Sequence, residues 1–327
     1  MSDQSTWLIT GGAGYIGAHV AEEFLQNGKE VLVYDSLSSG LYSRIDYLTK
    51  KYGSRIAFIE GDIRDRTLLS SCITDVNPQG IIHLAALKSV EDSISKPSEY
   101  MEVNFQATKE LLNLALRNKT QKFIYSSTAA VYGSGIQDRG VKEDDPKNPE
   151  SPYGKSKLMA EMEVQKFLEI PENRGTSLRF FNVVGAANFH LQDNSVGNLI
   201  PILLRRIQKG LPAIVFGNDY PTRDGTCVRD YVDVRDISRC HFAVSEIKRR
   251  LPFAMNVGTG KGLTVSEVIE IVQQEYGGSN LKVHVKSRRQ GDPATLFADT
   301  KLIRSEIDFE PQYSLKQAIA CISGYKQ

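Results

Sequence analysis

The sequence predicts an α/β protein built on a doubly wound parallel sheet, followed by a smaller C-terminal lobe that binds a substrate. Two observations support this fold class. Short apolar runs alternate with helical patterns through the first half of the chain, and a glycine-rich turn, Thr10 to Gly17, joins the first run to the first helix. This alternation is typical of a Rossmann-type sheet, whose ligands bind at the carboxyl ends of its strands.

The glycine-rich turn lies between the first expected strand and the first expected helix. Trp7 to Thr10 is a short apolar run, which indicates a buried strand. Tyr15 to Gln26 carries apolar side chains on one helical face and is followed by Asn27-Gly28, a common end to a helix. Strand, turn and helix follow one another in the order that dinucleotide binding requires.

Each glycine of this turn has a physical reason. Gly11 allows the tight turn, Gly14 allows the backbone to approach phosphates, and Gly17 allows the helix to pack closely on the strand. The N-terminus of the helix directs N–H groups and the positive end of its dipole at the ligand. The segment therefore predicts a site for a dinucleotide pyrophosphate.

The second strand, Glu30 to Tyr34, ends at Asp35, which follows Gly17 by 18 residues. An acid near this spacing hydrogen-bonds the adenosine ribose, and its charge would repel a 2′-phosphate. NAD is therefore favoured over NADP. The alternative is that Asp35 only turns the chain before Ser36.

A third strand, Arg55 to Glu60, precedes two further acids. Asp62 is placed to reach the adenine amino group, and Asp65 is equally suited to cap a helix. The remaining elements expected on this pattern are a strand over 81–86, a helix over 98–117, a strand over 122–127, a helix over 152–169 capped by Ser151, and a strand over 177–182.

The pattern of the chain changes after about Gly185, where loops richer in glycine, proline and asparagine appear. We therefore expect an NAD-binding domain over 1–184 and a substrate-binding domain over 185–327, with part of about 228–262 packing back on the first domain.

Composition excludes several other classes of function. Lysine and arginine number 40 and acids 39, so the net charge of +1 gives no general attraction to nucleic acid or a membrane. No apolar run approaches the length of a membrane span, and Met1 to Thr6 has neither the basic start nor the apolar core of a secretory signal. The four cysteines are scattered, so we expect no metal site and a reducing, cytoplasmic setting.

A tyrosine and a lysine point to the chemistry. Tyr153 and Lys157 are spaced i, i+4 on a helix and therefore share a face. A phenol titrates near pH 10, so acting as a base near pH 7 requires its pKa to fall by about 3 units, roughly 4 kcal/mol. The Lys157 ammonium and a positive nicotinamide ring would favour the phenolate. Thr128, just after the fifth strand, offers a hydroxyl between Tyr153 and a substrate oxygen.

These residues resemble the extended short-chain dehydrogenase/reductase superfamily and, within it, the UDP-glucose 4-epimerase (UDP-galactose 4-epimerase) family. The resemblance covers nearly the whole chain, and its most specific part lies in the nucleotide-sugar lobe. The segments that carry it are 10–17, 86–90, 126–133, 151–157, 178–185, 216–233 and 288–292.

The resemblance implies two sets of ligand contacts. NAD is expected to contact Gly11, Gly14, Tyr15, Ile16, Gly17, Asp35, Ser36, Asp62, Ile63, Ala85, Ala86, Lys88, Asn104, Ser126, Tyr153, Lys157 and Phe181. The UDP-sugar is expected to contact Lys88, Thr128, Tyr153, Asn182, Asn198, Leu199, Phe216, Arg229, Tyr231, Arg289 and Asp292.

The implied activity is interconversion of UDP-galactose and UDP-glucose through a transient 4-keto sugar, with Tyr153, Lys157 and Thr128 as the catalytic residues, in a homodimer. Three alternatives remain. They are a 4-epimerase of another UDP-sugar (UDP-N-acetylglucosamine or UDP-glucuronate), a nucleotide-sugar 4,6-dehydratase, and a non-catalytic NAD-binding protein. A dehydratase normally carries Asp-Glu after the threonine, whereas this chain has Ala129-Ala130.

Three positions depart from the usual family pattern. Thr128 stands where serine is frequent, and Ser36 stands where asparagine commonly follows the ribose-binding acid. Leu296 lies near a position whose size affects acceptance of N-acetylated sugars, and leucine is of intermediate size.

Overall fold

The structure, a computed structural model, describes residues 6–136, 139–195, 197–276, 281–289 and 291–322. The expectation that the chain starts without a secretory signal rests mainly on residues 1–5, which lie outside these ranges. The chain forms two units, which we describe separately. Unit 1 comprises Met1–Val131, Ser151–Arg179 and Ile237–Met255, and unit 2 comprises Tyr132–Glu150, Phe180–Asp236 and Asn256–Gln327.

Unit 1 is built on a seven-stranded sheet with the order β10-β6-β5-β4-β1-β2-β3. Its strands are β1 (Thr6–Thr10), β2 (Glu30–Asp35), β3 (Ile56–Glu60), β4 (Gly80–His83), β5 (Lys122–Thr128), β6 (Arg174–Phe180) and β10 (Ala254–Val257).

The chain reverses its direction of travel across this sheet at β1. From β1 it proceeds outward to β2 and β3, then returns to β4 on the other side of β1 and continues to β5 and β6. The pairs of β1 with β2 and with β4 are parallel, and Thr10 is in register with both Tyr34 and His83. The carboxyl ends of three strands therefore meet at the point where such sheets bind ligands, and the expected fold class is confirmed.

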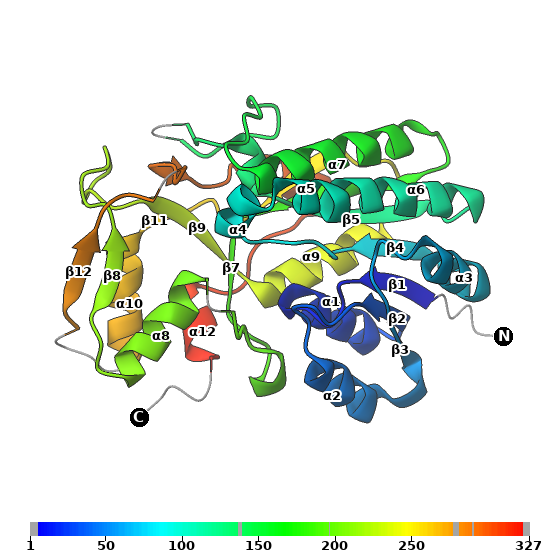
Figure 1. Cartoon of the computed structure of the whole chain (residues 1–327), viewed down its shortest axis with the longest axis horizontal. Coiled ribbons are helices and arrows are strands. Elements are labelled where there is room, and N and C mark those ends of the chain that lie inside the picture. Colours follow the sequence, from blue (N-terminus) through cyan, green and yellow to red (C-terminus); the bar gives the residue numbers. More distant parts are fainter. Residues whose placement is uncertain (1–5, 137–138, 196, 277–280, 290, 323–327) are drawn as a thin grey trace. The chain divides into compact units, whose positions relative to one another are not determined.

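Helices cover both faces of this sheet (Figure 1). On one face α3, α6 and α7 surround a core that includes Leu8, Phe123 and Phe167, whereas on the other Phe24 of α1 contacts Trp7 and Phe242 of α9 edge-on. The helices are α1 (Tyr15–Gln26), α2 (Tyr42–Tyr52), α3 (Arg66–Val76), α4 (Val90–Ser95), α5 (Pro97–Tyr100), α6 (Ala107–Arg117), α7 (Pro152–Glu169) and α9 (Val234–Glu246).

The helix expected over 98–117 is continuous in direction but not in type. A π-helical segment, Met101–Gln106, separates α5 from α6. Asn104 lies in this segment, where its side chain accepts from the N–H of Leu87 at 2.8 Å and donates to the carbonyl of Leu87 at 2.9 Å. The wider turn thus places an amide against the loop that follows β4, and π turns are frequent at functional sites.

The described residues of unit 2 form two smaller sheets and four α-helices. The strands β11, β9 and β13 lie side by side with β7 pairing β9, and β12 pairs β8. The strands are β7 (Asn182–Val184), β8 (Ala213–Phe216), β9 (Val228–Asp233), β11 (Gly262–Thr264), β12 (Val283–Lys286) and β13 (Thr295–Leu296). The helices are α8 (Leu199–Gln208), α10 (Val265–Tyr276), α11 (Lys301–Ile307) and α12 (Leu315–Ala320).

The core of unit 2 lies where α8, α10 and α12 meet its strands. Leu203, Val215, Val272 and Ile319 are buried there. Within the described ranges of the chain, no helix combines the length and the apolar character needed to cross a membrane.

Candidate functional site

Gly11 and Gly17 of the glycine-rich turn have no room for a side chain. Gly11 has a φ of +73°, and a Cβ there would lie 2.6 Å from the backbone nitrogen of Ala85. A Cβ on Gly17 would lie 2.1 Å from the carbonyl oxygen of Gly11, so α1 presses directly against the turn. Gly14 is the N-cap of α1 without a side-chain cap, and the first turn holds no acid. This helix end fits an anionic group such as a pyrophosphate.

Asp35 lies at the end of β2 and is bound to this turn. Its carboxylate accepts from the N–H of Ala13 at 3.0 Å and from the N–H of Leu37 at 2.8 Å. The side chain is buried, and burial raises its pKa above the ordinary value. The alternative expectation that Asp35 orders the turn before Ser36 therefore holds in this structure, and a role toward a ribose is compatible with it.

The next two acids take different roles. The carboxylate of Asp62 binds the guanidinium of Arg64 at 2.6 Å, and this pairing lowers the pKa of Asp62. For the expected contact with adenine, the carboxylate of Asp62 would have to bind the adenine amino group as well as Arg64. Asp65 caps α3 by accepting from the N–H of Leu68 at 3.0 Å, so the capping interpretation of Asp65 is confirmed.

The other residues expected at the cofactor differ in their surroundings. Ile63 is buried, Lys88 is exposed, and Tyr15, Ile16, Ala85 and Ala86 lie beside the glycine turn or at the end of β4. The hydroxyl of Ser126 is engaged with Nε2 of the buried His241 at 3.1 Å. Phe181 is buried in unit 2, directly after β6.

Tyr153 and Lys157 lie one turn apart on α7. The helix begins at Pro152, and Ser151 caps it by accepting from the N–H of Gly154 at 3.0 Å, as expected from the sequence. Tyr153 is hydrogen-bonded to Thr128 at the end of β5, and its ring meets Tyr100 edge-on. The structure therefore brings together the three residues that the sequence singled out as catalytic.

Burial acts on the pKa values of both Tyr153 and Lys157. Burial raises the pKa of Tyr153 above its ordinary value, and the hydrogen bond to Thr128 opposes that rise. Burial lowers the pKa of Lys157 to about 7, and the charge of Glu161 opposes that fall. The Nζ of Lys157 lies 4.3 Å from the centre of the Tyr125 ring.

Further polar groups lie next to this pair: Asn104, which was expected at the cofactor, and Ser156, Glu161 and Arg179, which the sequence did not single out. Asn104 donates to the hydroxyl of Ser156 at 3.1 Å, and that hydroxyl donates to the carbonyl of Tyr153 at 2.8 Å. Glu161, one turn beyond Lys157, pairs with the buried Arg179. The i, i+4, i+8 spacing of Tyr153, Lys157 and Glu161 was the available signal for the carboxylate.

In unit 2 the strand pairing gathers the residues expected to bind a UDP-sugar. Asn182 is in register with Tyr231 across β7 and β9, and Arg229 is in register with Leu296 across β9 and β13. Phe216 is the last residue of β8 and pairs with Lys286 of β12. The chain from β12 to β13 carries Arg289 and Asp292.

Four of these residues form two pairs. Arg229 makes an ion pair with Asp292, and the guanidinium of Arg289 lies 3.9 Å from the centre of the Phe216 ring. Unit 2 therefore holds the planar guanidinium groups of Arg229 and Arg289 and the aromatic ring of Phe216. Guanidinium groups suit a diphosphate, and an aromatic ring suits a base. Asn198 precedes Leu199, the first residue of α8, and its amide donates to Asp193 at 2.6 Å.

Three comparisons relate the chain to known proteins. It matches the family model described as GDP-mannose 4,6 dehydratase over residues 8–322. The UDP-glucose 4-epimerase of Halalkalibacterium halodurans is 37% identical over 312 residues, which cover 94% of this chain and 90% of that protein. The chain belongs to the UDP-glucose 4-epimerase family.

Solved structures of epimerases agree with this assignment. A UDP-glucose-4-epimerase from Stenotrophomonas maltophila, with bound NAD and formylated UDP-arabinopyranose, matches with a TM-score of 0.90 and 32% identity, covering 97% of this chain and 96% of that one. The UDP-Glc/GlcNAc 4-epimerase from Campylobacter jejuni matches with a TM-score of 0.81 and 35% identity, covering 97% of both chains.

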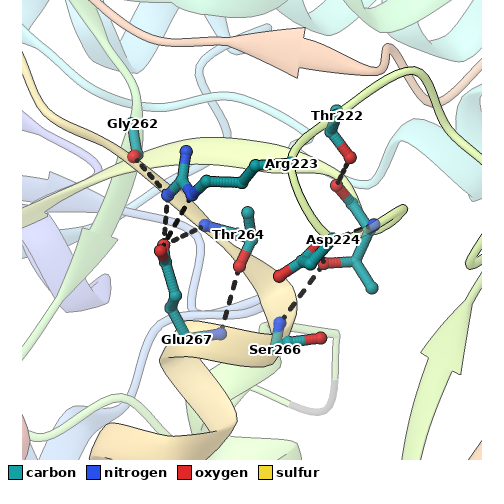
Figure 2. Close-up of polar contacts among 8 residues, drawn as sticks. Thr222, Arg223, Asp224, Gly262, Thr264, Ser266 and Glu267 are labelled. Atoms are coloured by element: carbon teal, nitrogen blue, oxygen red, sulfur yellow. Dashed lines mark hydrogen bonds and ion pairs between the residues drawn. The ribbon is translucent and has the colours of Figure 1, made fainter.

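In this member of the UDP-glucose 4-epimerase family, a polar clasp holds the loop between Phe216 and Arg229 (Figure 2). Arg223 donates to Glu267 at 2.8 Å and to the carbonyl of Gly262 at 3.0 Å. Glu267 also accepts from the N–H of Thr264, whose hydroxyl in turn accepts from the N–H of Glu267, which caps α10. The clasp ties the loop to the N-terminus of α10.

Proposed function

We propose that the protein is an NAD-dependent 4-epimerase that interconverts UDP-galactose and UDP-glucose. The observation that carries the proposal is the contact of Tyr153 with Thr128, one helical turn before the buried Lys157. The glycine turn supports NAD as the cofactor, because the positions of Gly11 and Gly17 exclude a Cβ and the N-terminus of α1 has no side-chain cap. NAD, when bound, would supply a group that can accept a hydride from the sugar C4 and return it to the same carbon.

The protein residues have separate tasks in this reaction. Tyr153 takes the proton of the sugar 4-hydroxyl and gives it back, with Thr128 hydrogen-bonded to the same oxygen. Lys157 provides the positive charge that favours the phenolate. Because burial raises the pKa of Tyr153, cationic charge is required before this phenol can act as a base.

Residues of unit 2 hold the nucleotide. Arg229 and Arg289 offer planar forks to the diphosphate, Phe216 offers a ring to the uracil, and Asp292 offers a carboxylate to the ribose. A firm grip on UDP and weak contacts to the hexose allow the keto sugar to present its other face before the hydride returns.

The absence of a further acid and base after Thr128 favours epimerisation over dehydration. Ala129 and Ala130 occupy the two positions that follow, and neither side chain can remove water from the sugar. A 4-epimerase of another UDP-sugar remains the second candidate. Leu296, whose size is intermediate, is buried in β13 in register with Arg229, so it lies within the proposed nucleotide-sugar site.

A substrate panel tests the proposed function. Purified protein should interconvert UDP-galactose and UDP-glucose without added reductant, as followed by NMR of the anomeric protons. UDP-N-acetylhexosamines and UDP-uronic acids in the same panel test the second candidate. Accumulation of a keto sugar, or steady consumption of added NAD, would identify a dehydratase or dehydrogenase instead.

We also infer a homodimer in a reducing, cytoplasmic setting. Helices α4 and α7 pack against each other in unit 1 and expose apolar side chains: Val90 and Ile94 on α4 and Met159 and Met162 on α7. Each of the four cysteines is a thiol and not half of a disulfide, and three of them are buried. Light scattering should give twice the 36.4 kDa mass of the chain, and Ile94→Glu should give the monomer.

A further inference from the structure

A buried ion pair lies on the inner face of α7. Glu161 and Arg179 are 7% and 4% exposed. The guanidinium of Arg179 binds both carboxylate oxygens, with Nε 3.0 Å from Oε1 and an Nη 2.8 Å from Oε2. The hydroxyl of Ser127 donates to the same carboxylate.

Fold stability is a weak reason for such a pair. Removing two charges from water costs about as much as their attraction returns, and apolar replacements of similar volume are often neutral or stabilising. The position of the pair suggests a different role. Glu161 follows Lys157 by one helical turn on the same face of α7, and Ser127 directly precedes Thr128 on β5.

Lys157 has little contact with solvent. Its side chain is 3% exposed, and Nζ faces the Tyr125 ring. The titratable and charged groups around it are His83 on β4, Tyr125 on β5, Tyr153 and Glu161 on α7, and Arg179 on β6 beyond Glu161. His83 is neutral at pH 7 because burial lowers its pKa to about 3. Glu161 is therefore the anion that acts on this ammonium.

We propose that Glu161 is a positioning residue for the reaction: clamped by Arg179 and Ser127, it keeps Lys157 charged next to Tyr153 and fixes the end of β5 that presents Thr128. The inference rests on the proposed function, since it assigns Glu161 to the residues that make Tyr153 a base. Arg179 holds the carboxylate in place through hydrogen bonds to both of its oxygens.

The first test measures the titration of Lys157 directly. The protein is labelled with ¹³Cε-lysine, and the Lys157 resonance is assigned by its loss in Lys157→Arg. In Glu161→Gln, the pKa of Lys157 should fall by about one unit or more, because a nearby opposite charge is lost. Glu22→Gln is the matched control: Glu22 is equally buried, pairs with Lys51 on other helices of unit 1, and should leave the Lys157 titration unchanged.

The second test measures turnover against pH. In Glu161→Gln the alkaline limb of the kcat profile should move to lower pH by a similar amount, while the KM for the UDP-sugar stays within about twofold. If Glu161→Gln does not fold, Glu161→Leu combined with Arg179→Met replaces the pair by apolar side chains, which should preserve the melting temperature. That double variant should shift the alkaline limb in the same direction but by less, because the cation of Arg179 is removed together with the carboxylate.

The outcomes separate the inference from the proposed function. A Lys157 titration unchanged in both the single and double variants overturns the inference, whatever the activity. A wild-type protein that epimerises no UDP-sugar overturns the proposed function, whereas the NMR titration still decides whether Glu161 keeps Lys157 charged.

Discussion

The Nζ atom of Lys157 lies 4.3 Å from the centre of the Tyr125 ring. The face of an aromatic ring attracts a cation, and the attraction is larger where water is excluded. Tyr125 is itself buried in β5, so this contact offsets part of the cost of burying the ammonium. The same contact holds the charge one helical turn from Tyr153, where the proposed reaction needs it.

Tyr153→Phe removes the hydroxyl that exchanges a proton with the sugar. Turnover should fall by roughly 10² to 10⁴-fold, the range typical of losing a general acid–base group. UDP affinity, measured by calorimetry, should change less than twofold, because the nucleotide contacts are assigned to unit 2. Tyr42→Phe, at an exposed position of unit 1, is the control and should retain full activity. Collapse of UDP binding in Tyr153→Phe would show that the tyrosine has another role.

The role of the Thr128 hydroxyl can be tested by two substitutions, one that removes it and one that keeps it. Thr128→Val removes the hydroxyl that bonds Tyr153 and accepts from the N–H of Ala130 at 3.2 Å. We expect kcat to fall by about ten- to a hundredfold, whereas Thr128→Ser keeps the hydroxyl and should remain close to wild type. Equal losses in the two variants would contradict a specific role of the hydroxyl at this position.

The clasp in unit 2 should affect nucleotide binding alone. Arg223→Gln loses the ion pair with Glu267, so the loop between Phe216 and Arg229 has to be ordered when UDP binds. The Kd for UDP should rise by about two- to tenfold with kcat unchanged at saturation. Arg304→Gln breaks an exposed ion pair with Glu310 in the same unit and serves as the control. A change in kcat without a change in Kd would contradict this role.

His83 should make the protein sensitive to acid. Its ring is buried between the hydroxyls of Thr10 at 2.7 Å and Thr108 at 2.8 Å, and burial lowers its pKa to about 3. Between that value and about 6.5, the unfolded chain binds more protons than the folded chain, so stability falls as pH falls. The slope contributed by this group is up to about 1.4 kcal/mol per pH unit.

Urea unfolding at several pH values checks this expectation. His83→Gln should be less stable than wild type at pH 7, because buried hydrogen bonds are lost, yet its stability should depend less on pH between 4 and 6. The exposed His284→Gln should keep the slope of the wild type. A slope in His83→Gln equal to that of the wild type would assign the acid sensitivity elsewhere, for example to the buried His241, whose pKa is also lowered, to about 4.

Local signals predicted the elements that depend on them. Apolar periodicity and caps were sufficient for α1 and α7, whose bounds agree with the sequence-based ranges, because their ends are set by Asn27 and by Ser151. The π-helical segment Met101–Gln106 could not be predicted in this way. Its extra width is tied to the bonds of Asn104 with the backbone of Leu87, which is distant in sequence.

The same distinction between local and distant determinants applies to the candidate site. The Tyr153–Lys157 spacing and the glycine turn are local patterns, and the structure brings Thr128 to Tyr153 as expected. The partner of Asp62 and the effect of burial on the pKa of Tyr153 were missed, because both depend on the surrounding side chains. Sequence spacing says which groups can meet, but the balance between desolvation and charge requires coordinates.

The seven-stranded sheet is assembled from three separate stretches of chain, and this has a consequence for synthesis. A nascent polypeptide that has emerged only as far as β6 lacks β10, so β6 is left as an unpaired edge strand. It also lacks Phe242, which packs on Phe24 in the folded protein. The first half of the protein therefore leaves the ribosome with an open strand edge and an exposed aromatic surface, the kind of intermediate that chaperones recognise. This exposure ends only after Phe242 and β10 (Ala254–Val257) have been translated, when about three quarters of the 327-residue chain has been made.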